Sequence, residues 1–438
     1  MKKIYIRVGI IISLLLSALL VFYIAVYTKT EQINQKIKKI DTFTLSGGDN
    51  SAVMGETPFN NKSATDNGIN DTGAGNGNSY DEQKASPDNK DGIYEIYNLA
   101  VAGVGFSSGK IIFTDRAEGY SFSKDNPLDK NKRLDQNAEA MVYDAEYSDN
   151  YILRKTFTDT FEAKYDIEKI NSKDTVLSLD GNLKSCHLFT GDILLCLKPT
   201  GSTTEVIMFD LKDENIKEQV LFASNLSHWQ TDYKNGNLYL LQSPSAYKES
   251  VFIKKELKGG ESVLEKGIGL DAKVSDDESY VLVSKYEDAK LTLYLDDIKN
   301  DTKTKLDLAT LARKCVFTNK DIVCAVPKEL PKDYVLLDDW LKGKFNYADE
   351  FYKINLEDLQ PKKLDFINRP STEIDAYKLR SSQNVNMLSF VNKRDGKGWV
   401  IILAQAEKTE SDVGAQELSS STASSSEEIK IKLKRDEI

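Results

Sequence analysis

The sequence predicts an all-β protein: a seven-bladed β-propeller of four-stranded blades, preceded by an N-terminal transmembrane helix and a disordered tether. The propeller is predicted by a hairpin pattern that recurs seven times between positions 100 and 405, in which a polar turn of Asn, Asp, Gly or Lys precedes an alternating β-branched and aromatic run. The turn centres lie near 109, 149, 191, 235, 277, 320 and 384, so the steps are about 40 residues long, except for one of about 64. This period, with about four strands in each repeat, is typical of propeller blades.

The membrane helix is predicted at residues 8–27, which contain no charged side chain. At about 1.5 Å per residue this run spans the hydrocarbon core of a bilayer. Residues 1–7 carry Lys2, Lys3 and Arg7, and positive charge is retained on the cytoplasmic side. A cleaved signal peptide is the alternative, but its apolar region is shorter and ends in a small-x-small site. We therefore expect a single-pass signal anchor in the cell membrane, with the propeller on the extracytoplasmic side.

Composition divides the rest of the chain into three parts. Residues 28–91 become rich in Gly, Asn, Asp and Ser with few large apolar residues, which predicts a flexible tether. Residues 92–405 hold the hairpin repeats, and 406–438 form a low-complexity tail that we expect to be disordered. The segment 92–106 has strand composition and precedes the first hairpin. Donated to the last blade, it would leave that blade without an open edge.

The four cysteines all lie in two of the hairpins. With a two-residue turn at Asn319 and Lys320, Cys315 faces Cys324 at a non-hydrogen-bonded site, where Cα atoms approach to about 4.5 Å. A three-residue loop centred on position 191 places Cys186 opposite Cys196 in the same way. Zinc ligands would be closer together in the sequence. Outside the cytoplasm this geometry predicts two disulfides, with buried free thiols as the alternative.

The composition argues against several classes of function. The net charge of −10 repels phosphate backbones, and no basic stripe interleaved with aromatics is present, so we expect no nucleic-acid partner. The chain holds only two histidines, and no hydrolase, metalloprotease or nucleotide-binding motif is found. We therefore predict no metal site, no cofactor and no catalytic residue. His187, inside a predicted strand, is interpreted as structural, whereas His228 and Trp229 are weaker binding candidates on a connection between blades.

The step of about 64 residues arises from an insert at 327–351, between the second and third strands of the predicted sixth blade. That connection shares a face of the propeller with the inter-blade connections, the face that usually binds ligands. The insert mixes aromatic and acidic residues, which suits a contact surface. The candidate binding residues are Asp338, Asp339, Trp340, Phe345, Tyr347 and Asp349. The alternative is that Trp340 and Phe345 fold back to cover the blade.

Several stretches make the chain similar to a known group of proteins. KCVFTNKDIVCAVPKELP (314–331) followed by DDWLKGKFNYADEFYKINLE (338–357), together with VAGVGF (101–106) and SFVNKRDG (389–396), resembles an uncharacterised family of membrane-anchored, propeller-like proteins from small-genomed, uncultivated bacteria. The S-D-N and S-D-D-E turns also resemble the turns of TolB-like and WD-type propellers. The resemblance implies a propeller fold and a membrane-anchored location. It implies no activity, because none is known for the family.

The function that the sequence predicts is binding of a protein or another envelope component through the insert-bearing face. A carbohydrate-active hydrolase or lyase that uses carboxylates at the propeller axis is one alternative. A structural subunit of an envelope assembly is the other.

Overall fold

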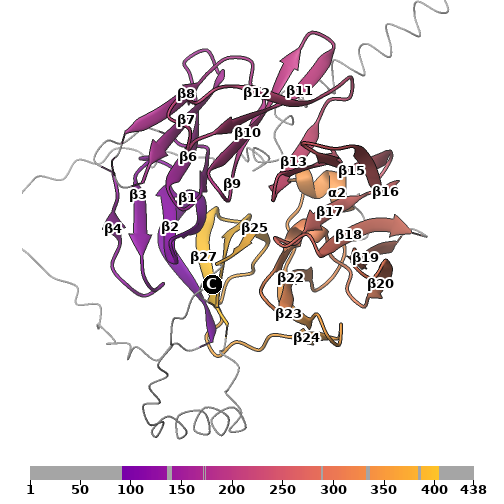
Figure 1. Cartoon of the computed structure of the whole chain (residues 1–438). Helices are drawn as coiled ribbons and strands as arrows, with labels where there is room; N and C mark the ends of the chain where they lie inside the picture. The colour runs from indigo at the N-terminus through magenta and orange to yellow at the C-terminus, as the bar shows by residue number, and fades with distance from the viewer. Residues whose placement is uncertain are drawn as a thin grey trace, which may run out of the picture.

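A computed structural model describes residues 91–135, 141–170, 172, 174–287, 290–331, 336–382 and 386–403. The sheets in these ranges are arranged around a common axis, as Figure 1 shows, and the molecule is a β-propeller. The predicted all-β class is confirmed. The predicted helix at 8–27, the tether up to position 90 and the tail at 406–438 lie outside the described residues. Among the described residues, no helix has both the length and the apolar character needed to cross a membrane.

Five sheets of the described residues have four antiparallel strands each. They are β5 (Asp144–Tyr147), β6 (Tyr151–Phe157), β7 (Ala163–Lys169) and β8 (Thr175–Leu179); β9 (Ser185–Phe189), β10 (Ile193–Thr200), β11 (Thr203–Asp210) and β12 (Gln219–Ser224); β13 (Trp229–Lys234), β14 (Asn237–Gln242), β15 (Glu249–Glu256) and β16 (Glu261–Ile268). The fourth and fifth are β17 (Asp271–Val274), β18 (Tyr280–Glu287), β19 (Lys290–Asp297) and β20 (Thr302–Leu306); β21 (Cys315–Phe317), β22 (Asp321–Pro327), β23 (Asp349–Asn355) and β24 (Pro361–Lys363). Two short helices are also present: η1 (Ala312–Lys314) directly precedes β21, and α2 (Leu336–Leu341) lies between β22 and β23.

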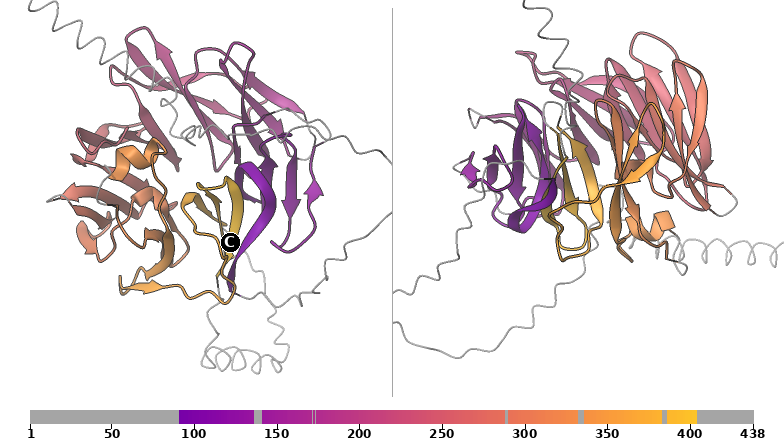
Figure 2. Two further views of the ribbon diagram at one scale, coloured as in Figure 1. Left: turned by 180° about the vertical axis from the view of Figure 1, so that it is seen from behind. Right: turned by 90° about the horizontal axis from the view of Figure 1, so that it is seen from below.

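The sixth sheet has seven strands, in the order β25-β26-β27-β1-β2-β3-β4. Its members are β1 (Gly92–Ser107), β2 (Lys110–Asp115), β3 (Ser121–Lys124), β4 (Lys132–Arg133), β25 (Ala376–Ser381), β26 (Met387–Asn392) and β27 (Lys397–Ile402). The first half of β1 pairs with β27, from Gly92 opposite Ile402 to Glu95 opposite Trp399, and its second half pairs with β2. The predicted donation of an N-terminal strand to the last repeat is therefore confirmed, and Figure 2 shows the indigo strand β1 beside the yellow strands of that repeat.

Packing of neighbouring sheets forms the core. Where the ring closes, Val101 and Phe113 of β1 and β2 pack with Val400 of β27 in one buried apolar cluster. The second half of β1 also lies very close to β5. A Cβ atom added at Gly103 would sit 2.0 Å from the carbonyl oxygen of Ala145, so only glycine fits there. The glycines of the VAGVGF stretch thus allow close approach of two strands.

Strand direction assigns every connection to one of two faces. Because consecutive strands in each sheet are antiparallel, connections between second and third strands lie on the same face as connections between sheets. We call this the loop face; it includes the described residues of the connections at 116–120, 134–135, 141–143, 158–162, 180–184, 225–228, 243–248, 328–331 and 342–348. Connections such as 125–131 and 298–301, between third and fourth strands, lie on the opposite face.

Candidate functional site

The strands nearest the axis carry many charged side chains. The second half of β1 and β5, β9, β13, β17, β25 and η1 contact one another around the axis (Figure 1). Alternate residues of these strands turn polar side chains toward one another. We call the following residues the axial cluster: Asp144, Glu146, His187, Asp232, Lys234, Asp271, Lys273, Arg313, Lys378 and Arg380.

Ion pairs of the axial cluster join strands that are distant in the sequence. The ammonium of Lys378 on β25 binds Asp144 on β5, 234 residues away. The guanidinium of Arg380 lies 3.2 Å from Oε1 of Glu146, also on β5. Both pairs are largely shielded from solvent, so bulk water screens them less than surface pairs. They tie the last repeat to the second one, across the glycine-containing strand β1.

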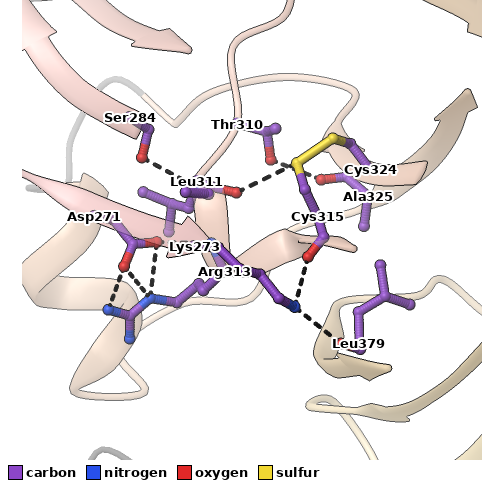
Figure 3. Close-up of a disulfide and its surroundings, with 11 residues drawn as sticks. Asp271, Lys273, Ser284, Thr310, Leu311, Arg313, Cys315, Cys324, Ala325 and Leu379 are labelled. Atoms are coloured by element: carbon purple, nitrogen blue, oxygen red, sulfur yellow. Dashed lines mark hydrogen bonds and ion pairs between the residues drawn. A yellow bond between two sulfur atoms is a disulfide. The ribbon is translucent and has the colours of Figure 1, made fainter. Parts of the chain in front are cut away.

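Lys273 differs from these paired cations, as the close-up in Figure 3 shows. Its ammonium donates to the carbonyl oxygens of Cys315 at 2.8 Å and Leu379 at 3.3 Å. Beside it, the guanidinium of Arg313 binds the carboxylate of Asp271 at 2.7 Å. Burial, together with the nearby charge of Lys234, lowers the pKa of Lys273 to about 8. The axis therefore holds a half-buried cation whose hydrogen bonds go to neutral carbonyl groups.

Both predicted disulfides are present. Cys186 is bonded to Cys196 with Cα atoms 4.1 Å apart, and Cys315 to Cys324 with Cα atoms 4.0 Å apart. Each pair consists of directly opposite residues in its hairpin, as the turn positions predicted. Cys315 also anchors the axial cluster, since its carbonyl oxygen accepts the hydrogen bond of Lys273 (Figure 3).

The insert does not present its aromatic residues as predicted. The side chains of Trp340, at the end of α2, and Tyr347 are 0% and 2% exposed, and their rings lie 5.7 Å apart. They pack with Leu311 and Leu337 in a buried cluster that also includes Leu291 of β19. The expectation that Trp340 and Tyr347 form a contact surface is therefore wrong, because both side chains turn into the body of the protein. Apolar rings gain more by burial than by exposure to water.

Beneath these rings lies a buried ionic network. Nζ of Lys314 lies 2.7 Å from Oδ2 of Asp349 and 2.6 Å from Oδ1 of Asp375, and all three side chains are at most 1% exposed. The indole nitrogen of Trp340 donates to Oδ2 of Asp375 at 2.8 Å. Burial lowers the pKa of Lys314, but the two carboxylates outweigh it and raise that pKa above the ordinary lysine value. Asp349 is thus an internal ion-pair partner, and its prediction as a binding residue is also wrong.

The remaining insert residues make local contacts. Asp338 accepts from the backbone nitrogen of Ala246 at 2.7 Å, which attaches the insert to the β14–β15 connection on the loop face. Asp339 pairs with Lys344 at 2.7 Å, and the ring of Phe345 meets that of Tyr347 edge-on at 5.0 Å. These three residues are partly exposed, and their role in binding stays a prediction.

The weaker binding candidates, His228 and Trp229, also differ in their exposure to solvent. Trp229 is only 4% exposed, packs with the β10 and β14 side chains, and donates from Nε1 to the carbonyl oxygen of Leu226 at 3.0 Å. It belongs to the core, so its prediction as a binding residue is wrong. His228 is exposed on the β12–β13 connection with a φ of 66°, and partial desolvation together with the charge of Lys184 lowers the pKa of its imidazole. Its role in binding stays a prediction.

Exposed apolar side chains are found instead on other connections of the loop face. Phe161 is 86% exposed, Tyr247 74%, Met141 61% and Leu226 43%. Phe161 sits at the tip of the β6–β7 connection with a φ of 60°, in a turn closed by its own N–H to the carbonyl oxygen of Thr158. Large apolar residues at loop tips add nothing to the core, so their exposure favours a contact role.

Sequence reasoning missed the axial cluster, although a signal for it exists. In each predicted hairpin one strand comes before the polar turn, and in a propeller that first strand is the innermost of its blade. Charged residues at alternate positions of such strands, as in DAEY (144–147), DAKV (271–274) and YKLR (377–380), therefore point to one axis.

Comparison with known proteins identifies no sequence relative: no protein-family model and no curated protein matches the chain. Solved structures of similar fold include the β-propeller domain of Myceliophteria thermophila Cps50 (Swd1), with 9% identity, a TM-score of 0.47 and coverage of 71% of this chain and all of that one. A chain of the mitotic checkpoint complex has 8% identity, a TM-score of 0.48 and coverage of 71% and 95%. TolB from Acinetobacter baumannii has 11% identity, a TM-score of 0.37 and coverage of 69% and 79%. The strand pairing described above is what identifies the propeller.

Proposed function

We propose that this protein is a binding module whose loop face recognises a protein or another component of the cell envelope. The observation that carries this proposal is the exposure of Phe161 and Tyr247 on two connections of that face. Aromatic anchors contribute a large share of the energy in protein interfaces. The partly exposed insert residues Asp338 and Asp339 supply acidic groups on the same face.

The proposal includes an extracytoplasmic location, with the chain anchored by residues 8–27. Two observations support it. The uncharged run follows Lys2, Lys3 and Arg7, which favours a cytoplasmic N-terminus. The two disulfides are of a kind that persists in oxidising compartments and is rare in the cytosol. The resemblance to membrane-anchored propellers agrees with this placement.

The proposal also counts seven blades. Five blades are the four-stranded sheets, and the seven-stranded sheet supplies two more, because β1 serves as the outer strand of one and the inner strand of the next. Such sharing by the N-terminal strand closes the ring without a free edge where the ends meet.

The carbohydrate alternative gains no specific support from the axis. A glycosidase needs two carboxylates that face one substrate. Asp144, Glu146 and Asp271 each bind a cation of another strand instead.

Surface variants test the proposed face. Phe161→Ser with Tyr247→Ser should lower capture of the partner from a detergent extract of the native envelope by at least about tenfold, because each lost aromatic anchor costs more than about 1 kcal/mol. Leu128→Ser with Ile298→Ser is the matched control, since these residues are 59% and 47% exposed on the opposite face. Captured protein is quantified by mass spectrometry. Equal capture by both variants would place the contact elsewhere.

A further inference from the structure

Three side chains of the inner strands form a connected row of hydrogen bonds. Oγ of Ser185 lies 2.9 Å from Nε2 of His187, and Nδ1 of the same imidazole lies 3.0 Å from Oε1 of Glu146. Ser185 and His187 are two residues apart on β9, so both side chains point to the same side of the strand. Glu146 comes from β5 of the neighbouring sheet, and its Oε2 also accepts from the backbone nitrogen of Leu188 at 2.9 Å.

The charge of Glu146 determines the tautomer of His187. Burial opposes ionisation of this carboxyl group, but the neighbouring His187 and Arg380 outweigh it and hold the pKa of Glu146 well below its usual range. An ionised carboxylate only accepts hydrogen bonds, so Nδ1 of His187 must donate to it. In a neutral imidazole Nε2 is then the acceptor, and the hydroxyl of Ser185 donates to it. This is the arrangement that activates a serine hydroxyl as a nucleophile.

We propose that Ser185, His187 and Glu146 form a nucleophile–base–acid row that hydrolyses small carboxylic esters at the propeller axis. Oγ of Ser185 bonds to the ester carbonyl carbon while its proton passes to Nε2 of His187. The carbon–oxygen bond to the alcohol then breaks, and His187 returns the proton to the leaving alcohol. Water adds to the acyl-serine through the same base, which releases the acid and restores the Ser185 hydroxyl, so that one ester and one water give one acid and one alcohol.

The surroundings indicate the substrate class. The guanidinium of Arg380 lies 3.2 Å from Oε1 of Glu146 and is 32% exposed, so it places a positive charge at the Glu146 end of the row. The ammonium of Lys273 donates to the carbonyl oxygen of Leu379, next to Arg380 in the chain. His187 is 28% exposed and reachable, whereas Ser185 is 7% exposed, which restricts the site to small molecules. These cations favour an ester that carries a carboxylate.

Covalent labelling tests the row directly on the purified chain. A fluorophosphonate probe should label the folded protein, and peptide mapping should place the label on Ser185. The chain should hydrolyse 4-nitrophenyl hydrogen succinate faster than 4-nitrophenyl acetate. Ser185→Ala and His187→Gln should each lower the rate by at least about 10²-fold. Ser107→Ala, which alters another buried serine of an inner strand that bonds only to the backbone oxygen of Asp149, should leave label and rate unchanged.

Glu146 is a positioning residue in this proposal, and its test is the split between kcat and KM. In Glu146→Gln the imidazole loses the anionic acceptor that fixes its tautomer, so kcat should fall by at least about tenfold while KM changes little. Equal kcat values for this variant and the wild type would make Glu146 merely structural. A folded wild-type protein that takes no label at Ser185 would overturn the proposed activity. Partner capture by Ser185→Ala should stay at the wild-type level, which separates this activity from the binding function.

Discussion

Replacing Lys314 with methionine will lower the free energy of unfolding by about 3–5 kcal/mol, because it leaves the carboxylates of Asp349 and Asp375 buried without their cation. Methionine keeps much of the lysine volume, so the loss reports mainly the missing charge. The measurement is the midpoint and slope of urea unfolding for the chain from residue 91 onward.

The control for this variant is a more exposed ion pair between β23 and β24, the sheet that also carries Asp349. Lys363 binds Glu350 at 2.7 Å with its side chain 38% exposed, and Lys363→Met should change stability by less than about 1 kcal/mol. Equal effects of the two variants would show that the buried network contributes no more than a surface pair.

Truncating the insert's two buried rings, Trp340→Ala with Tyr347→Ala, will destabilise the protein by at least about 3–5 kcal/mol. The change removes the two largest side chains of a buried apolar cluster and also breaks the hydrogen bond from the indole to Asp375. Tyr247→Ala is the matched control, because this 74% exposed side chain should alter stability by at most about 0.5 kcal/mol. If the double variant were as stable as the wild type, the two insert aromatics would again be candidates for binding.

Local rules were sufficient for the repeat and for the disulfides. Turn residues fix the register of a two-strand hairpin, so the opposition of Cys315 and Cys324 follows from a stretch of ten residues. Alternation of apolar and polar side chains likewise identifies each strand from a few neighbouring residues. The donated strand was also predictable, because a strand-like segment with no partner of its own precedes the first hairpin and the ring requires one.

The sequence left open whether the insert is exposed or folds back, because its burial depends on partners far away in the sequence. From its local sequence alone, Trp340 is an ordinary candidate for a contact residue. It is buried in the structure, where its indole donates to Asp375, which lies 35 residues later in the chain. Lys314, which precedes the insert, neutralises that same carboxylate. The axial cluster is still less local, since Lys378 and Asp144 are 234 residues apart and meet only after the ring closes. No periodic pattern within one element carries that information.

Site-specific photo-cross-linking in intact cells tests the proposed binding face most directly. A benzoylphenylalanine residue replaces Phe161 on the loop face of the full-length chain, and a second variant carries it at Leu128 on the opposite face. Our account predicts a light-dependent adduct with one defined partner from position 161 and none from position 128. Adducts from position 128 alone, or the same adducts from both positions, would contradict binding through the loop face.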